Sequence, residues 1–286
     1  MIYQYVAGIH NRIYILVCLF ISLNQSFSQS KLDFSKEIQN TKDYNFTEIE
    51  FADTAENVIL SSTLITPKKA YSKIVIITPG SGQDTRNSHY VLAENLLANG
   101  IAVYRFDDRG VGKSKGTVNF SVDQIITDLF YAIDNLQKIN SLSRKQIGLL
   151  GHSLGGIATI YNYQKGFKLD FLVLMATPIE KFGKFTKPQY QSKPNAKKVS
   201  TKTVFQNIQI PMLFVAGTND SFFESNKTAD LIDNLNNKNI ETKILHGLNH
   251  FLRQGTDDWK KTKEYQSLYE IDPTALEIIT NWIKKV

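Results

Sequence analysis

Cysteine is almost absent from this chain of 286 residues, because Cys18 is the only one. It lies in a mostly apolar run, Ile13 to Leu23, which follows a single charge at Arg12 and precedes small residues before the Ser28–Gln29 bond. This layout predicts a signal peptide over residues 1–28, too short in its apolar part to span a bilayer. We therefore expect an exported (periplasmic or secreted) chain, with neither stable membrane insertion nor any disulfide or thiol once the segment is removed.

Histidine is also scarce, with five in the chain, and no pair has a metal-binding spacing such as H-E-x-x-H. We therefore expect no metal and no cofactor. The run RFDDRGVGKS at residues 105–114 contains glycines but lacks P-loop spacing, and no helix is expected to begin at its lysine. It is better explained as a structural turn held by pairs of Asp and Arg side chains.

Charge of neither sign dominates, with 33 Lys and Arg against 27 Asp and Glu and a net charge of +6. A basic chain can bind nucleic acid, but no nucleic-acid-binding motif accompanies the charge. We interpret the excess as a solvated, lysine-rich surface and expect no nucleic-acid partner. The sequence does not indicate an oligomeric state.

Strand and helix patterns alternate after an N-terminal extension over residues 29–47. The expected strands are 48–53, 58–67, 73–78, 101–106, 146–150, 171–175, 211–216 and 241–245. The expected helices are 88–99, 122–139, 157–163, 228–237 and 274–285. This alternation predicts one α/β domain over residues 48–286, with an eight-stranded, mostly parallel sheet, helices on both faces, and the first two strands as an antiparallel edge. Residues 177–210 are lysine-rich and are expected to form a small lid.

The most informative motif is GHSLGG at residues 151–156, placed between an expected strand and an expected helix. A G-x-S-x-G in this setting is typical of a nucleophile elbow, in which the serine occupies a sharp, strained turn. The flanking glycines remove the Cβ atoms that would collide with the neighbouring strand and helix. We predict that Ser153 is the nucleophile of an acyl-transfer reaction.

A serine nucleophile needs a base, and the base needs a carboxylate to orient it. His250, in the loop GLNHF after the last strand, is the expected base, with His246 as the alternative. His152 lies inside the elbow, where its side chain should point away from the site. Asp220, in the turn GTND, is the expected acid, with Glu224 as the alternative.

An oxyanion needs backbone N–H donors beside the serine. We expect them from Leu154, which follows the nucleophile, and from Ser81, in the loop PGSGQD after an early strand.

Together, GHSLGG, PGSGQD, RFDDRGVGKS, GTND and GLNHF resemble the α/β-hydrolase superfamily, closest to its esterase-like and serine aminopeptidase or dienelactone-hydrolase-like members. The resemblance covers residue 48 to the C-terminus and implies the α/β-hydrolase fold and a Ser-His-Asp acyl-enzyme mechanism. This sequence departs from that of many relatives in having Pro79-Gly80 where they have His-Gly.

Three functions remain open: a carboxylic-ester hydrolase acting on small-molecule or saccharide esters, an aminopeptidase-type amidase, and a non-catalytic binding domain. An aminopeptidase cap carries acidic residues that anchor the substrate amine, whereas residues 177–210 contain one acid, Glu180, among many lysines. The composition of this segment therefore favours the esterase.

Overall fold

The computed structural model describes residues 34–118, 121–179, 201–257 and 264–286. Eight strands form one sheet in the order β1-β2-β4-β3-β5-β6-β7-β8. Their bounds are β1 Tyr44–Asp53, β2 Val58–Pro67, β3 Lys73–Thr78, β4 Ala102–Phe106, β5 Gln146–His152, β6 Phe171–Met175, β7 Met212–Gly217 and β8 Ile240–Leu245. β1 and β2 are antiparallel to their neighbours, and the six strands from β4 to β8 are parallel. The eight-stranded, mostly parallel sheet predicted from the sequence is thus confirmed.

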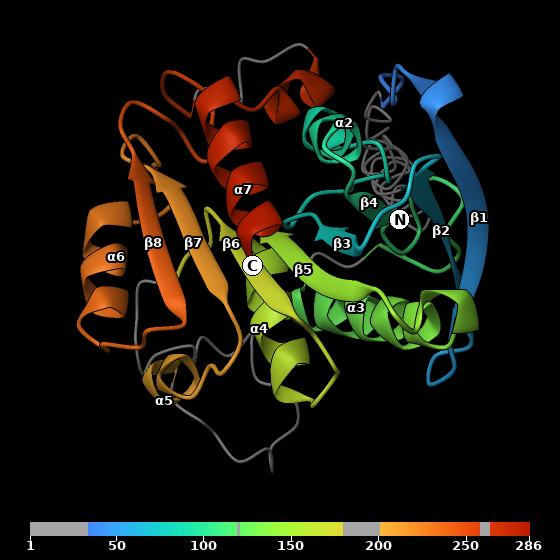
Figure 1. The fold of residues 1–286 in the computed structure, drawn as a ribbon, viewed down its shortest axis with the longest axis horizontal. Helices are drawn as coiled ribbons and strands as arrows, with labels where there is room; N and C mark the ends of the chain where they lie inside the picture. The colour runs from blue at the N-terminus through green and yellow to red at the C-terminus, as the bar shows by residue number, and fades with distance from the viewer. Residues whose placement is uncertain (1–33, 119–120, 180–200, 258–263) are drawn as a thin grey trace, which may run out of the picture. The chain divides into compact units, whose positions relative to one another are not determined.

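Helices cover both faces of this sheet (Figure 1). One face carries α2 Tyr90–Ala98 and α7 Pro273–Lys285, and the other carries α3 Val122–Gln137, α4 Leu154–Gln164, α5 Thr201–Gln206 and α6 Ser225–Asp233. Short 3₁₀ turns occur at Thr41–Asp43, Asn140–Leu142 and Tyr265–Tyr269. Within the described residues, no helix has both the length and the apolar character needed to cross a membrane.

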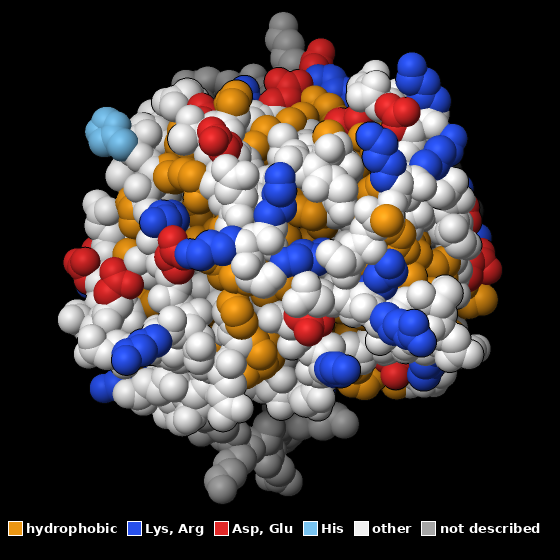
Figure 2. All heavy atoms as spheres, in the orientation of Figure 1, with side chains coloured by type: hydrophobic (Ala, Val, Ile, Leu, Met, Phe, Trp, Pro, Cys, Tyr) orange, Lys and Arg blue, Asp and Glu red, His pale blue; other side chains and the backbone are white. Residues whose placement is uncertain are grey.

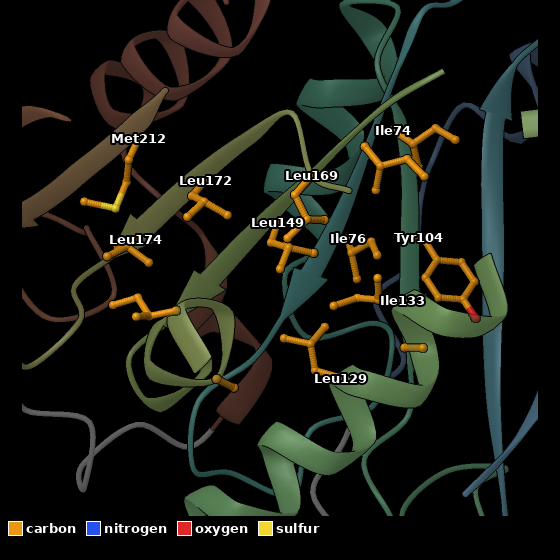
Figure 3. Close-up of a cluster of buried hydrophobic side chains, with 14 of the residues drawn as sticks. Ile74, Ile76, Tyr104, Leu129, Ile133, Leu149, Leu169, Leu172, Leu174 and Met212 are labelled. Atoms are coloured by element: carbon orange, nitrogen blue, oxygen red, sulfur yellow. The ribbon is translucent and has the colours of Figure 1, made fainter. Parts of the chain in front are cut away.

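Alternate residues of the central strands face opposite helical layers, as the two-residue period of a strand requires. In β3, Ile74 and Ile76 pack with Leu129 and Ile133 of α3, as Figure 3 shows. Val75 and Ile77 belong instead to the cluster beneath α2 and α7. Every residue of β3 is buried, which explains why its sequence is an almost unbroken apolar run.

Strand order places the candidate residues at one edge of the sheet. β3 lies between β4 and β5. The chain therefore runs from β3 to β4 on one side, and then crosses to β5 on the other side of β3. Such a switch in direction opens a crevice beyond the carboxyl ends of the strands, where ligands bind in open α/β sheets. The loop after β3 and the elbow after β5 both emerge there.

Several elements differ from expectation, three of them in ways that bear on the site or the core. β1 begins at Tyr44, inside the expected extension, because it pairs with β2 along its whole length. α6 begins three residues earlier than expected. It also ends four residues earlier, at Asp233, and Asn236 just beyond adopts φ 53°, a left-handed conformation that a helix cannot continue through. α5 falls within the segment assigned to a lid, and its Phe205 is fully buried in the core. Residues 180–200 of that segment, and the signal peptide, lie outside the described residues, so both stay predictions.

Candidate active site

Ser153 occupies the turn between β5 and α4 with φ 52° and ψ −121°. A positive φ is disfavoured for any residue that has a Cβ atom, so the turn is strained. The close packing around it depends on glycine. A Cβ at Gly155 would collide with the carbonyl oxygens of Thr78 and Pro79, and one at Gly151 would collide with the carbonyl of Gly155. The predicted nucleophile elbow therefore has the expected backbone shape.

Ser153, His250 and Asp220 form one hydrogen-bonded line. Ser153 Oγ lies 3.0 Å from His250 Nε2, and His250 Nδ1 lies 2.8 Å from Asp220 Oδ2. The side chains of His250 and Asp220 are only 5% and 0% exposed, so the acid–base contact is shielded from water. The turn after β5 supplies Ser153, the loop after β8 supplies His250 and the loop after β7 supplies Asp220.

The carboxylate determines which nitrogen of His250 carries the proton. An ionised Asp220 can only accept a hydrogen bond, so Nδ1 donates to it and Nε2 is left with its lone pair. The Ser153 hydroxyl then donates to Nε2, the arrangement in which a histidine can accept the proton of a serine. Asp220 Oδ1 accepts the backbone N–H of Phe222 at 2.9 Å, which fixes the carboxylate plane.

The two alternative residues lie elsewhere. His246 is exposed just past the end of β8. Glu224 is the N-cap residue of α6, is largely exposed, and pairs with Lys227 at 3.4 Å. Asp220 and His250, the residues preferred from the sequence, are therefore the ones in hydrogen-bond contact with each other and with Ser153.

The loop after β3 lies directly against Ser153. A Cβ built on Gly80 would stand 3.0 Å from Ser153 Cβ and 3.6 Å from Ser153 Oγ, so glycine lets the loop approach this closely without crowding the serine. Ser81 follows in the same loop and is exposed, while Leu154 is the first residue of α4. Their roles as oxyanion N–H donors stay predictions.

Several residues around the triad gave no signal in the sequence. Asp257 accepts the N–H of His250 at 2.8 Å and the N–H of Ser221 at 2.7 Å, so it ties the loops of the base and the acid together. The ring of Phe222 lies 4.3 Å from the imidazole of His250, at 31° to it, and is half exposed. Both residues lie on loops, where spacing carries no information about tertiary contacts.

Asp84, at the end of the PGSGQD loop, is buried and accepts the hydroxyl of Tyr269 at 2.7 Å. Burial raises the pKa of this carboxyl to about 7, which favours its neutral form well above the usual range. Its backbone N–H donates to Asp108 Oδ2 at 2.9 Å, and burial likewise raises the pKa of Asp108. The position of the loop is thus stabilised by hydrogen bonds of buried polar groups as well as permitted by glycine.

The RFDDRGVGKS run forms the predicted turn held by ion pairs. Arg109 pairs with Asp53 at 2.6 Å and also with Asp128. Asp107 binds Arg86 at 2.8 Å and accepts the N–H of Lys113. No three His, Cys, Asp or Glu side chains in the described parts of the chain are grouped to hold a metal ion. On the face drawn in Figure 2, Lys and Arg are scattered among other side chains rather than gathered in one basic patch.

Comparison with known proteins points to hydrolases. The family described as serine aminopeptidase, S33, matches residues 69–198. An uncharacterized protein of Rickettsia prowazekii is 26% identical over 170 residues, which are 58% of this chain and 64% of that protein. Protein phosphatase methylesterase 1 of Candida albicans is 28% identical over 110 residues, 38% of this chain and 29% of that protein. The aligned parts span less than two thirds of either curated relative.

Among solved structures, an esterase of Pyrococcus furiosus superposes with a TM-score of 0.61 at 22% identity, covering 85% of this chain and 93% of that one. At this identity the likeness concerns the fold. The fold, the family match over residues 69–198 and the strand–serine–helix elbow together support assigning the chain to the α/β-hydrolase superfamily.

Proposed function

We propose that this protein is a serine hydrolase that cleaves carboxylic esters of small molecules or saccharides through an acyl-enzyme intermediate. The observation that carries the proposal is the line from Asp220 through His250 to Ser153, with contacts of 2.8 and 3.0 Å. Serine hydroxyls are weak nucleophiles, and a base in this position is what makes one reactive.

The reaction follows from the hydrogen-bond directions. Ser153 Oγ attacks the ester carbonyl while its proton passes to His250 Nε2, and the carbonyl oxygen becomes an oxyanion held by the N–H groups of Ser81 and Leu154. The imidazolium, stabilised by Asp220, then gives that proton to the departing alkoxide, which leaves as the alcohol. Water, deprotonated by the same histidine, attacks the acyl-enzyme and releases the acid and the free serine.

Esters are favoured over amides by the composition of residues 177–210. Residues 177–210 hold Glu180 as their only acid among many lysines, which suits an uncharged or anionic substrate better than a peptide amine. Two of the similar proteins carry esterase names, which agrees with this choice. Aminopeptidase activity is the second candidate, because the matching family is described as serine aminopeptidase.

The remaining candidates are less well supported. A non-catalytic domain of this fold needs no intact line of acid, base and nucleophile, whereas all three are in contact here. We also propose that the chain is exported, on the strength of the signal-peptide layout in residues 1–28.

The test compares the wild-type chain with Ser153→Ala on short-chain p-nitrophenyl esters and on aminoacyl p-nitroanilides, together with labelling by a fluorophosphonate probe. We expect ester turnover and probe labelling in the wild type and neither in the variant. Turnover by Ser153→Ala at the wild-type rate would refute the mechanism. Cleavage of the anilides alone would refute the choice of esters while keeping the serine chemistry.

A further inference from the structure

Two buried histidines form a hydrogen-bonded chain beside the triad without belonging to it. His152, the last residue of β5, is 2% exposed, and His89, the N-cap residue of α2, is 3% exposed. His89 Nε2 lies 3.3 Å from His152 Nδ1, and His89 Nδ1 lies 2.9 Å from Ser88 Oγ. At the other end, His152 Nε2 lies 3.0 Å from the backbone carbonyl oxygen of His250.

The direction of every hydrogen bond in this chain is determined from its carbonyl end. A carbonyl only accepts, so His152 Nε2 carries a proton. A neutral imidazole has one proton, so His152 Nδ1 accepts from His89 Nε2, and His89 Nδ1 in turn accepts the hydroxyl proton of Ser88. With both rings neutral, the hydrogen-bond directions make both of them the Nε2–H tautomer.

The surroundings favour the same neutral state. Burial lowers the pKa of His89 to about 3, and the nearby Arg105 guanidinium acts in the same direction. Burial, followed by the neighbouring His250 and His89, holds the pKa of His152 well below its usual value. Aromatic rings also border the pair: the ring of Tyr269 lies 4.3 Å from that of His89, and the ring of Phe251 lies 5.2 Å from that of His152. A second proton on His152 would set two N–H donors against each other.

Because His152 and Ser153 are consecutive, the elbow holds His250 at two points. Ser153 contacts the imidazole Nε2 and His152 contacts the backbone carbonyl of the same residue. We propose that His152, supported by His89 and Ser88, is a positioning residue that sets the backbone of His250 so that its Nε2 stays within reach of Ser153 Oγ. This role rests on the proposed hydrolase function, since it serves the base of that reaction.

The tautomers give a test that does not depend on activity. Two-bond ¹⁵N–¹H correlation spectra of histidine-labelled protein distinguish a neutral Nε2–H ring from a neutral Nδ1–H ring and from imidazolium. We expect His89 and His152, assigned with single His→Gln variants, to remain neutral Nε2–H rings from pH 5 to pH 9. An Nδ1–H tautomer or an imidazolium at either position within this range would overturn the proposal.

Two substitutions at His152 separate positioning from packing. In His152→Gln the side-chain amide reaches the place of Nε2 and still donates to the carbonyl of His250. In His152→Asn the shorter side chain can accept from His89 in the place of Nδ1 but no longer reaches that carbonyl. We expect His152→Gln to keep kcat within about threefold of wild type and His152→Asn to lose about 10- to 100-fold in kcat with KM little changed, because misplacement of a reacting group by about 1 Å is that costly.

The outcomes separate the two proposals. Equal kcat values for the Asn and Gln variants, measured well below the unfolding temperature of each, would refute the positioning role. Ester turnover by the wild-type chain would still support the proposed hydrolase function. A wild-type chain that neither turns over esters nor reacts with fluorophosphonate would refute the proposed function, and with it the positioning role, whatever the spectra show. Should either variant fail to fold, the tautomer spectra of the wild-type chain still decide whether the hydrogen-bond chain exists.

Discussion

Replacing Ser153 with glycine should leave the protein more stable than replacing it with alanine. Ser153 has φ 52° and ψ −121°, in a region where any side chain beyond glycine is strained. Ser153→Gly and Ser153→Ala both delete the hydroxyl and its contact with His250, so they differ only in the Cβ atom. Comparison of these two variants isolates the backbone strain from the loss of the hydrogen bond.

The expected difference follows from two opposing terms. A residue held in a sparsely populated backbone region costs about 1–3 kcal/mol, which glycine relieves. Glycine also gives the unfolded chain more freedom, which costs about 0.4–1 kcal/mol relative to alanine. Ser153→Gly should therefore unfold with a free energy about 1 kcal/mol greater than Ser153→Ala, equivalent to roughly 2–4 °C in Tm for a chain of this size.

Urea denaturation of both variants, followed by fluorescence and by circular dichroism, measures this difference. Both should be catalytically inactive, so the comparison concerns stability alone. Matching midpoints for the two variants, or a lower midpoint for Ser153→Gly, would show that the turn is not strained in solution. The reasoning from φ and ψ would then be refuted.

Two further substitutions test the supports of the site. The Asp84→Asn variant should gain roughly 1–3 kcal/mol in free energy of unfolding relative to wild type as the pH rises from 5 to 8. Burial raises the pKa of Asp84 to about 7, so between about pH 4 and pH 7 the carboxyl ionises in the unfolded wild type but stays protonated in the folded one, and the folded wild type loses stability. The asparagine amide does not titrate, so the variant does not lose stability in this way. Urea titrations at both pH values measure it, and a constant difference would contradict it. Gly155→Ala should lower both stability and kcat, because its Cβ would displace the loop at Thr78 and Pro79. The control is Gly166→Ala, since Gly166 has φ 86° and open space around it. This control should lose only about 1 kcal/mol in free energy of unfolding and keep its kcat unchanged. Equal kcat in the two alanine variants would argue against a role for this packing in catalysis.

The parts of the fold that the sequence predicted are those with a strong local signal. The buried strands are short apolar runs, and α3 shows a continuous apolar face, so period and burial identify them without tertiary information. The elbow is predictable for the same reason, since strand, serine and helix are consecutive. The end of α6 was missed because Asn236 stops the helix by its own backbone conformation, which no periodicity reveals.

His152 shows where local reasoning about the site stops. Its position inside the elbow predicts only that its side chain turns away from the nucleophile, and the structure agrees with that much. Its partners are His89, at the start of α2, and the carbonyl of His250, in the loop after β8, and they are brought to it by the order of strands in the sheet. Because β3, β5 and the later strands all end at one edge, residues about 60 and 100 positions apart meet there. The turn that holds Ser153 is thus set by sequence-local geometry, whereas the placement of His250 depends on contacts that exist only once the whole sheet has formed.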